Sequence, residues 1–421
     1  MRASLAYGRG SLDVDLPEDA RILTGKQARG LAHPARAIAD ALAAPLAGPP
    51  LAERVRPGDT VAIVHTDITR ATPNALILPI LLSALEAAGV RPRDITLINA
   101  LGTHRRQTDA ELRTLLGDAV VAGYRCIQHD AWDDANLVDF GTTGRGNPVR
   151  INRAYAKSDV RILTGFIEPH FFAGFSGGPK GVLPSIAAFE SVLSNHGFDL
   201  IAHPGSTWGV TEGNPIWEEM REMALRTAPT FLLNVTMNDA RELTGVFAGD
   251  LLPAHAAGCR FVAEHALVPV ADPFDIVITT NSGYPLDQNL YQTVKGMSAA
   301  ARVVRKGGAI ILAAGCEDGL PNHGQYASLL RQGETPRGVL DMLAQPGFHA
   351  HDQWQAQTQA QIQLRADVYV HTDGLSDADV RAALLTPARL PQALPGLIAR
   401  YGPRVCALPN GPLVIPTLMP A

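Results

Sequence analysis

The chain has little of what marks a secreted, membrane or nucleic-acid-binding protein. Its 421 residues include only four cysteines, with no CxxC pair, so reduced thiols are expected rather than a disulfide framework or a thiolate metal site. No run approaches the ~20 apolar residues of a membrane helix, and the first residues lack the apolar stretch of a secretory signal. The net charge of −5 argues against a nucleic-acid partner. We expect a cytoplasmic protein with neither a membrane nor a nucleic-acid partner.

Two common nucleotide-binding motifs are also missing. No GxGxxG turn follows a predicted strand, and the pattern GxxxxGK[ST] fails at residues 174–181. Because these motifs place glycine backbone and a helix N-terminus against phosphate groups, a standard dinucleotide site and a P-loop are unsupported.

Strand and helix signals alternate along the whole chain. Strands are predicted over 61–64, 95–100, 160–165, 231–235, 276–279, 309–314 and 368–371. Helices are predicted over 74–88, 108–116, 186–195, 215–225, 253–265, 288–304, 326–332 and 377–385, with Ser185 capping the third of these. Repeated βα units of this kind indicate an α/β fold with mostly parallel sheets.

A proline-rich stretch at 265–275 predicts a domain boundary. We expect an N-terminal α/β domain over 1–268 that holds the catalytic and cofactor residues. A C-terminal α/β domain would follow over 269–421, and a return of its last residues to the first domain is left open. The active site is expected in a cleft between the two domains.

Two polar clusters directly follow predicted strands, where parallel sheets place their ligands. In the first, Asp67 to Pro73, Arg70 could clamp a carboxylate bidentately, with Asp67 holding the arginine. A polar loop that caps the next helix is the alternative. In the second, Gly102-Thr-His-Arg, the position of His104 favours an acid–base role over that of a structural histidine.

Two further clusters complete the set. The segment EPHFFAGFSGGPKG and the later NHG contain His170, Lys180 and His196 around glycines that could cradle a phosphate; a glycine turn with an exposed lysine is the alternative. In YQTVKG, Gln292 and Lys295 share one helix face and could meet Arg70 across a substrate, unless that face is simply solvated.

The motifs DxTR, GTHR, EPHxxAGxSGGxK, NHG and YQxxKG occur here in that order. Together they resemble the nickel-dependent lactate racemase family, the 2-hydroxyacid racemases and epimerases that use a nickel-pincer nucleotide. The resemblance implies that Lys180 carries this cofactor, pyridinium-3-thioamide-5-thiocarboxylic acid mononucleotide, through a thioamide. It implies that His196 ligates nickel and that His104 and His170 form the acid–base pair.

The resemblance also implies supporting roles in the site. Arg70, Tyr291, Gln292 and Lys295 would bind the substrate, with Asp67 supporting Arg70. The remaining residues would contact the cofactor: Gly177 and Gly178 would let the backbone approach the nucleotide, and Trp354 would line the site. One departure is Ser185, which stands where the family pattern leads us to expect glycine after Pro184.

The implied reaction moves a hydride from a lactate-like, malate-like or sugar-acid substrate to the pyridinium. The soft sulfur donors to the nickel would come from the cofactor, so no cysteine cluster is needed in the protein. The proteins that make the cofactor would be partners of this chain. Two alternatives stay open. An NAD-dependent 2-hydroxyacid dehydrogenase shares the hydride chemistry, and a non-catalytic nickel-nucleotide carrier would keep Lys180 and His196 but would not need His104, Arg70 and Gln292.

Overall fold

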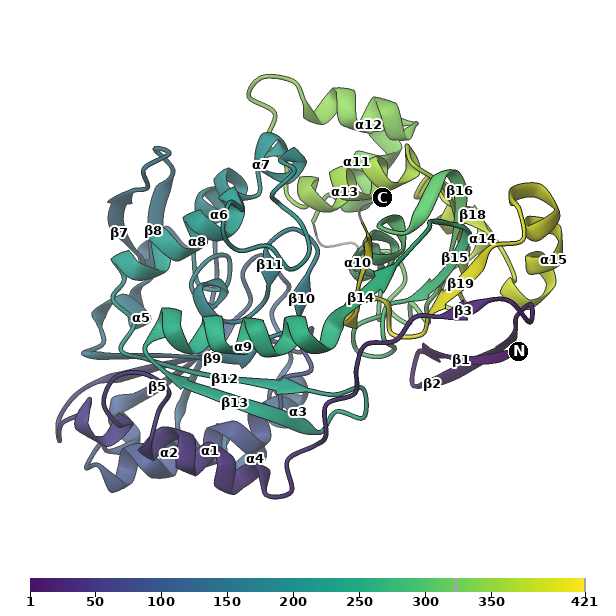
Figure 1. Cartoon of the computed structure of the whole chain (residues 1–421). Coiled ribbons are helices and arrows are strands. Elements are labelled where there is room, and N and C mark those ends of the chain that lie inside the picture. Colours follow the sequence, from purple (N-terminus) through teal and green to yellow (C-terminus); the bar gives the residue numbers. More distant parts are fainter. Residues whose placement is uncertain (322–323, 420–421) are drawn as a thin grey trace.

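The computed structural model describes residues 1–321 and 324–419. Two six-stranded sheets organise it into two α/β halves (Figure 1), which confirms the predicted fold class. Within the described ranges, no helix is both long and apolar enough to cross a membrane.

The first sheet has the strand order β13-β12-β9-β4-β5-β6 and is parallel except for the β12–β13 pair. Its strands are β4 (Val61–Thr66), β5 (Ile95–Ala100), β6 (Arg125–Gln128), β9 (Val160–Phe166), β12 (Phe231–Met237) and β13 (Leu243–Gly249). The central strands are buried almost throughout, as expected when helices cover both faces of a sheet.

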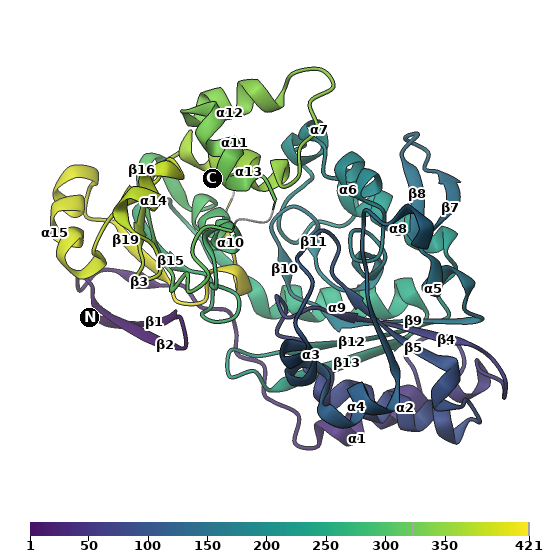
Figure 2. The same ribbon diagram turned by 180° about the vertical axis from the view of Figure 1, so that it is seen from behind.

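Helices cover this sheet from both sides (Figures 1 and 2). On one face, α2 (Asn74–Ala87) buries Ile77, Leu78, Leu81 and Leu85, a helical spacing that forms one apolar stripe. The same core includes α1 (Pro34–Ala43). On the other face, α9 (Leu251–Ala266) packs against β12 and β13. The remaining helices of this half are α3 (Asp109–Leu116), α4 (Asp118–Gly123), α5 (Arg153–Lys157), α6 (Phe189–Asn195), α7 (Phe198–Ala202) and α8 (Pro215–Arg226).

The second sheet has the strand order β18-β17-β16-β15-β19-β3, and all its pairs are parallel. Its strands are β3 (Arg21–Ile22), β15 (Phe274–Thr280), β16 (Val304–Ala313), β17 (Asp367–His371), β18 (Thr386–Pro387) and β19 (Val405–Leu408). The helices of this half are α10 (Leu290–Ala301), α11 (Tyr326–Gly333), α12 (Pro336–Leu343), α13 (Gln353–Gln363), α14 (Asp377–Ala382) and α15 (Leu390–Tyr401).

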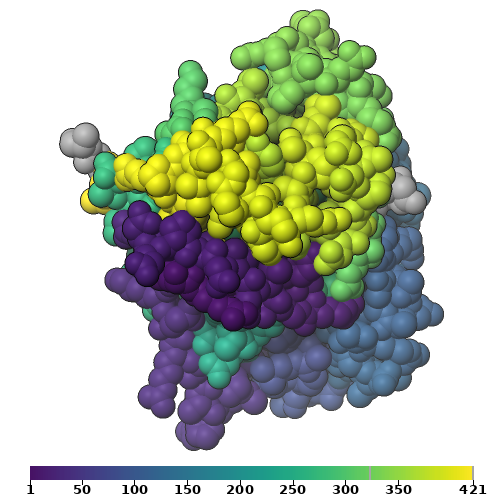
Figure 3. Space-filling view, turned by 90° about the vertical axis from the view of Figure 1, so that its right-hand side faces the viewer, coloured from purple at the N-terminus to yellow at the C-terminus, as the bar shows by residue number. Residues whose placement is uncertain are grey.

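The first residues of the chain pack with the second half rather than the first. The hairpin of β1 (Arg2–Tyr7) and β2 (Gly10–Asp15) shares a core with β15, β16 and α15, and in Figure 3 the N-terminal residues lie along the C-terminal ones. Strand β14 (Leu267–Val270) pairs with β20 (Ile415–Leu418) next to the predicted boundary. The division at residue 268 stays a prediction.

Shorter elements complete the fold. They are the hairpin of β7 (Leu137–Thr142) and β8 (Pro148–Asn152), the hairpin of β10 (Pro169–His170) and β11 (Gly174–Phe175), and the 3-10 turns η1 (Leu51–Glu53), η2 (Pro92–Asp94), η3 (Asp134–Asn136), η4 (Gly178–Gly181) and η5 (Gly411–Leu413).

The predicted helix 186–195 begins later than expected, and Ser185 does not cap it. Helix α6 begins at Phe189 because the preceding segment pairs with β8: Ala188 N donates to Arg150 O at 2.8 Å, and Asn152 N donates to Ile186 O at 2.9 Å. The Ser185 hydroxyl instead donates to the Lys180 carbonyl at 2.6 Å.

Candidate functional site

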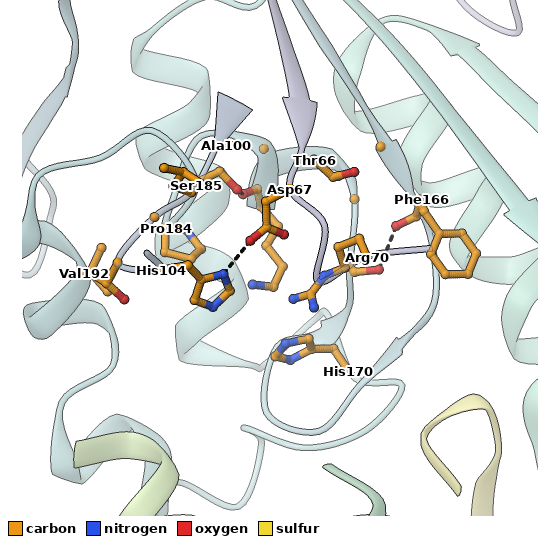
Figure 4. A pocket seen from close by; sticks show the side chains of 18 of the residues that line it. Thr66, Asp67, Arg70, Ala100, His104, Phe166, His170, Pro184, Ser185 and Val192 are labelled. Atoms are coloured by element: carbon orange, nitrogen blue, oxygen red, sulfur yellow. Dashed lines mark hydrogen bonds and ion pairs between the residues drawn. The ribbon is translucent and has the colours of Figure 1, made fainter. Parts of the chain in front are cut away.

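One pocket gathers every site residue predicted from the sequence. Loops at the carboxyl ends of β4, β5 and β9 approach α10 and α13 of the second half around it, as the rule for parallel sheets requires. In Figure 4, the side chains of Asp67, Arg70, His104 and His170 converge on the same space. The predicted residues that line it are Asp67, Arg70, His104, His170, Gly177, Gly178, Lys180, His196, Tyr291, Gln292, Lys295 and Trp354.

The Asp67 carboxylate is paired with His104, so the expectation that it holds Arg70 is corrected. Its Oδ2 lies 2.7 Å from His104 Nδ1 (Figure 4), and its Oδ1 accepts from the Thr69 hydroxyl at 2.7 Å. Burial raises the pKa of Asp67, but His104, Arg70 and Thr69 together outweigh it and hold the pKa below its usual value. The ionised carboxylate accepts the Nδ1–H of His104 and leaves Nε2 free to take a proton.

The partner of Arg70 is Glu168, a residue that the sequence analysis did not single out. Arg70 Nε lies 3.6 Å from Glu168 Oε1, and both side chains are largely buried. One Nη1 hydrogen of Arg70 also reaches the Thr69 carbonyl at 3.3 Å. The pair joins the loop after β4 to the segment after β9.

His170 is buried, and the hydrogen-bond partner of its Nδ1 differs from that of His104. The backbone N–H of Ala173 donates to His170 Nδ1 at 3.2 Å, which keeps the proton of the neutral ring on Nε2. Burial, followed by the charges of Lys180, Arg70 and Lys295, lowers the pKa of His170 well below its ordinary value. The rings of Phe171 and Phe172 lie 4.9 and 4.6 Å from its centroid.

The loop that presents Lys180 depends on two glycines with positive φ, Gly177 at 75° and Gly178 at 52°. A Cβ at Gly178 would lie 2.4 Å from the ring of His255, and one at Gly177 would lie 2.5 Å from Asn234 Oδ1. Close packing against the protein therefore requires both glycines, independently of any bound nucleotide.

Side chains missed by the sequence analysis hold this loop from behind. Asn234 Oδ1 accepts from Gly178 N at 2.7 Å, and His255 Nε2 lies 3.0 Å from the Ser176 carbonyl. These residues stand on β12 and α9, far along the chain, and a single buried polar residue in a strand or helix gives no pattern that would have found them.

The Lys180 amine faces a cationic, largely apolar environment. Burial and then the charge of Arg70, opposed by Glu168 and Asp67, lower its pKa to about 7. A large fraction of the amine is then uncharged near neutral pH, the form that acts as a nucleophile.

His196 directly follows α6 and lines the same pocket. Its Nδ1 is buried with no hydrogen-bond partner in the described part of the chain. Burial and then the charge of Lys180 lower the pKa of His196 to about 3, so the ring is neutral, as metal ligation requires. The Trp354 ring meets it edge-on at 5.1 Å. Across residues 1–321 and 324–419, no group of three or more His, Cys, Asp or Glu side chains could hold a metal unaided.

The helix α10 closes the pocket from the second half. Lys295 Nζ donates to Gln292 Oε1 at 2.7 Å, which confirms that these side chains share one face. The Trp354 indole N–H donates to the Tyr291 hydroxyl at 3.0 Å. Burial, reinforced by Arg70 and opposed by Glu168, lowers the pKa of Lys295 well below its usual value.

Comparisons with known proteins agree along nearly the whole chain. Residues 7–209 match the family model described as the lactate racemase N-terminal domain, and residues 270–414 match the lactate racemase C-terminal domain. The lactate racemase of Thermoanaerobacterium thermosaccharolyticum is 34% identical over 98% of both chains. That of Lactiplantibacillus plantarum is 37% identical over 87% of both.

Solved structures give the same result. The lactate racemase apoprotein of T. thermosaccharolyticum superimposes with a TM-score of 0.91 at 33% identity, covering 99% of this chain and 100% of that one. A Thermotoga maritima protein, 20% identical with a TM-score of 0.72 over 94% of this chain and 100% of its own, shares the fold. This chain belongs to the lactate racemase family and is an isomerase of the 2-hydroxyacid racemase and epimerase type.

Proposed function

We propose that the chain inverts the hydroxylated carbon of a small 2-hydroxyacid with the help of a nickel-pincer nucleotide attached to Lys180. One observation carries the proposal. A single pocket gathers two differently backed imidazoles, an amine of lowered pKa, a neutral buried imidazole and a carboxylate-binding set of cations.

The residues present fit this cofactor. An amine with a pKa near 7 suits thioamide formation at Lys180. His196 offers one neutral imidazole and no protein cluster supplies further metal donors among the described residues, which suits a nickel ion whose other donors belong to the nucleotide. When bound, the group would take a hydride from the substrate carbon and return it.

The side chains around it divide the remaining work. Arg70 and Lys295 would hold the substrate carboxylate while the carbon is planar, and Gln292 would direct the amino group of Lys295. His104 Nε2, backed by Asp67, would take the hydroxyl proton of one enantiomer. His170, on the segment after β9, would serve the other. The largely buried walls would exclude water during the ketoacid stage.

Lactate-like, malate-like and sugar-acid substrates all carry the carboxylate and α-hydroxyl that this arrangement addresses. The proteins that make the nucleotide would be the partners of this chain, because none of the described side chains that line the pocket is itself a hydride acceptor.

The test begins with protein produced together with the cofactor-synthesis enzymes. Mass spectrometry should show an adduct on Lys180 that is absent from Lys180→Ala, and nickel should copurify in proportion to it. Chiral chromatography of a panel of 2-hydroxyacids should then show racemisation by the loaded protein only. An unmodified Lys180 together with no copurified nickel would contradict the proposal, as would net ketoacid formation that requires added NAD.

A further inference from the structure

We propose that Glu168 is a positioning residue: its buried carboxylate holds the Nε edge of Arg70, so that the Nη nitrogens of the guanidinium face the substrate carboxylate. The inference rests on the proposed function for the identity of that ligand.

The contacts of Arg70 show which of its donors are already engaged. The Nε edge faces Glu168 at 3.6 Å, and one Nη1 hydrogen reaches the Thr69 carbonyl at 3.3 Å. A guanidinium carries its N–H donors in a planar fork, so fixing these two leaves the outer Nη hydrogens for a ligand. In Figure 4 the guanidinium points toward the space beside His170.

Glu168 is itself anchored to the segment that carries the reacting groups. Its N–H donates to the Ser176 hydroxyl at 2.9 Å, and its carbonyl accepts from Ser176 N at 2.9 Å. The Ser176 hydroxyl in turn donates to the Phe166 carbonyl at 2.7 Å. Glu168 therefore fixes Arg70, which lies on a different loop, relative to the segment that carries His170 and Lys180.

The charges of the pocket give Glu168 a second reason to be there. Arg70, Lys180 and Lys295 line the same pocket, and Glu168 and Asp67 are the carboxylates among the main charges that act on the two lysines. Asp67 is already engaged by His104 and Thr69. Glu168 is thus the carboxylate left to balance the cations, and its removal should lower the pKa of both lysines further.

Two variants separate geometry from charge. Glu168→Gln keeps an acceptor for Arg70 but loses the charge, and Glu168→Ala loses both. In loaded enzyme, Glu168→Ala should raise KM roughly 10- to 100-fold, the usual cost of leaving a buried charged group without its partner, with a smaller change in kcat. Glu168→Gln should recover part of that loss. Glu190→Gln, which removes an exposed carboxylate of the same segment, should change neither constant.

A double-mutant cycle tests whether Glu168 acts through Arg70. In an Arg70→Ala background, adding Glu168→Ala should leave KM unchanged, because the group being positioned is gone. If instead the two losses add, or if Glu168→Ala alone leaves KM unchanged, Glu168 does not position Arg70.

Apoprotein measurements keep this test separate from that of the proposed function. Binding of L-lactate to the apoprotein, followed by NMR, should weaken in Glu168→Ala and recover partly in Glu168→Gln. The pH at which Lys180 becomes reactive toward an acylating reagent should fall in both variants. If the loaded wild type fails to racemise, the proposed function fails, but these two apoprotein measurements still decide the role of Glu168. If L-lactate binding and Lys180 reactivity are unchanged in the variants, the positioning role of Glu168 is wrong even in an active racemase.

Discussion

At the scale of single residues, the two histidines proposed as the acid–base pair have different partners at Nδ1. Asp67, a carboxylate, accepts the Nδ1 proton of His104, whereas the Ala173 amide donates to Nδ1 of His170. A carboxylate favours a ring that gains a second proton, and an N–H donor opposes it. We therefore expect His104 to accept a proton from a substrate hydroxyl at its free Nε2, whereas His170 must first lose its bond to Ala173.

Replacing either histidine should slow racemisation. His104→Ala and His170→Ala should each reduce kcat roughly 10²- to 10⁴-fold, the usual contribution of an acid–base side chain. In single-turnover experiments, His104→Ala should fail to oxidise one enantiomer and His170→Ala should fail to oxidise the other. His203→Ala, at an exposed histidine, is the matched control. Full racemase activity in both site variants would sink the two-base scheme.

The Lys180 amine should become reactive at an unusually low pH. Its pKa is lowered to about 7 by burial and by Arg70, so the fraction of uncharged amine rises as the pH increases through about 7. Acylation of the apoprotein, followed by peptide mass spectrometry, should show a midpoint there, with the adduct on exposed Lys306 correcting for the reagent. A midpoint near the ~10.4 of a free lysine would show that the site does not activate the amine.

At the scale of elements, the turn η4 places Lys180 through packing that only glycine allows. Gly178→Ala would put a Cβ 2.4 Å from the His255 ring at a φ of 52°, so we expect a shifted turn, poor cofactor attachment and a lower Tm. Gly181→Ala in the same turn is the control, because its Cβ would make only ordinary contacts with Leu163, the nearest at 3.5 Å. Equal attachment in both variants, measured by intact-protein mass, would contradict this reading.

The elements that the sequence predicted well are those whose signal is local. Apolar runs located the central strands, and polar motifs at their carboxyl ends located Arg70, His104 and His170. The predicted start of α6 was wrong because Ile186 and Ala188 form backbone hydrogen bonds with β8, and this pairing overrides helix propensity.

Partner choice was equally invisible in the sequence. Asp67 and Arg70 are close neighbours in one motif, yet their partners, His104 and Glu168, come from other loops. The geometry of three strand ends decides these pairings, and no spacing along the chain encodes it.

At the scale of the whole molecule, the pocket needs both halves, and the chain itself ties them together. The first strands cross to the second sheet, where β3 pairs with β19 and the β1–β2 hairpin packs against β15 and β16. The pocket-lining side chains of α10 therefore stand on a half whose core includes the N-terminal hairpin.

A destabilising substitution in the N-terminal hairpin should consequently reduce the stability of the C-terminal half. Leu5 is fully buried against the second sheet, and Leu5→Ala should lower the free energy of unfolding by about 2–5 kcal/mol, as for other buried leucines. Leu46→Ala, at a leucine that is 59% exposed, should have little effect. Hydrogen exchange should show the lost protection mainly in β15, β16 and β19. Loss of protection confined to the first sheet would contradict this account. It would mean that the hairpin stabilises the N-terminal half, which follows it in sequence, rather than the C-terminal half, against which it packs.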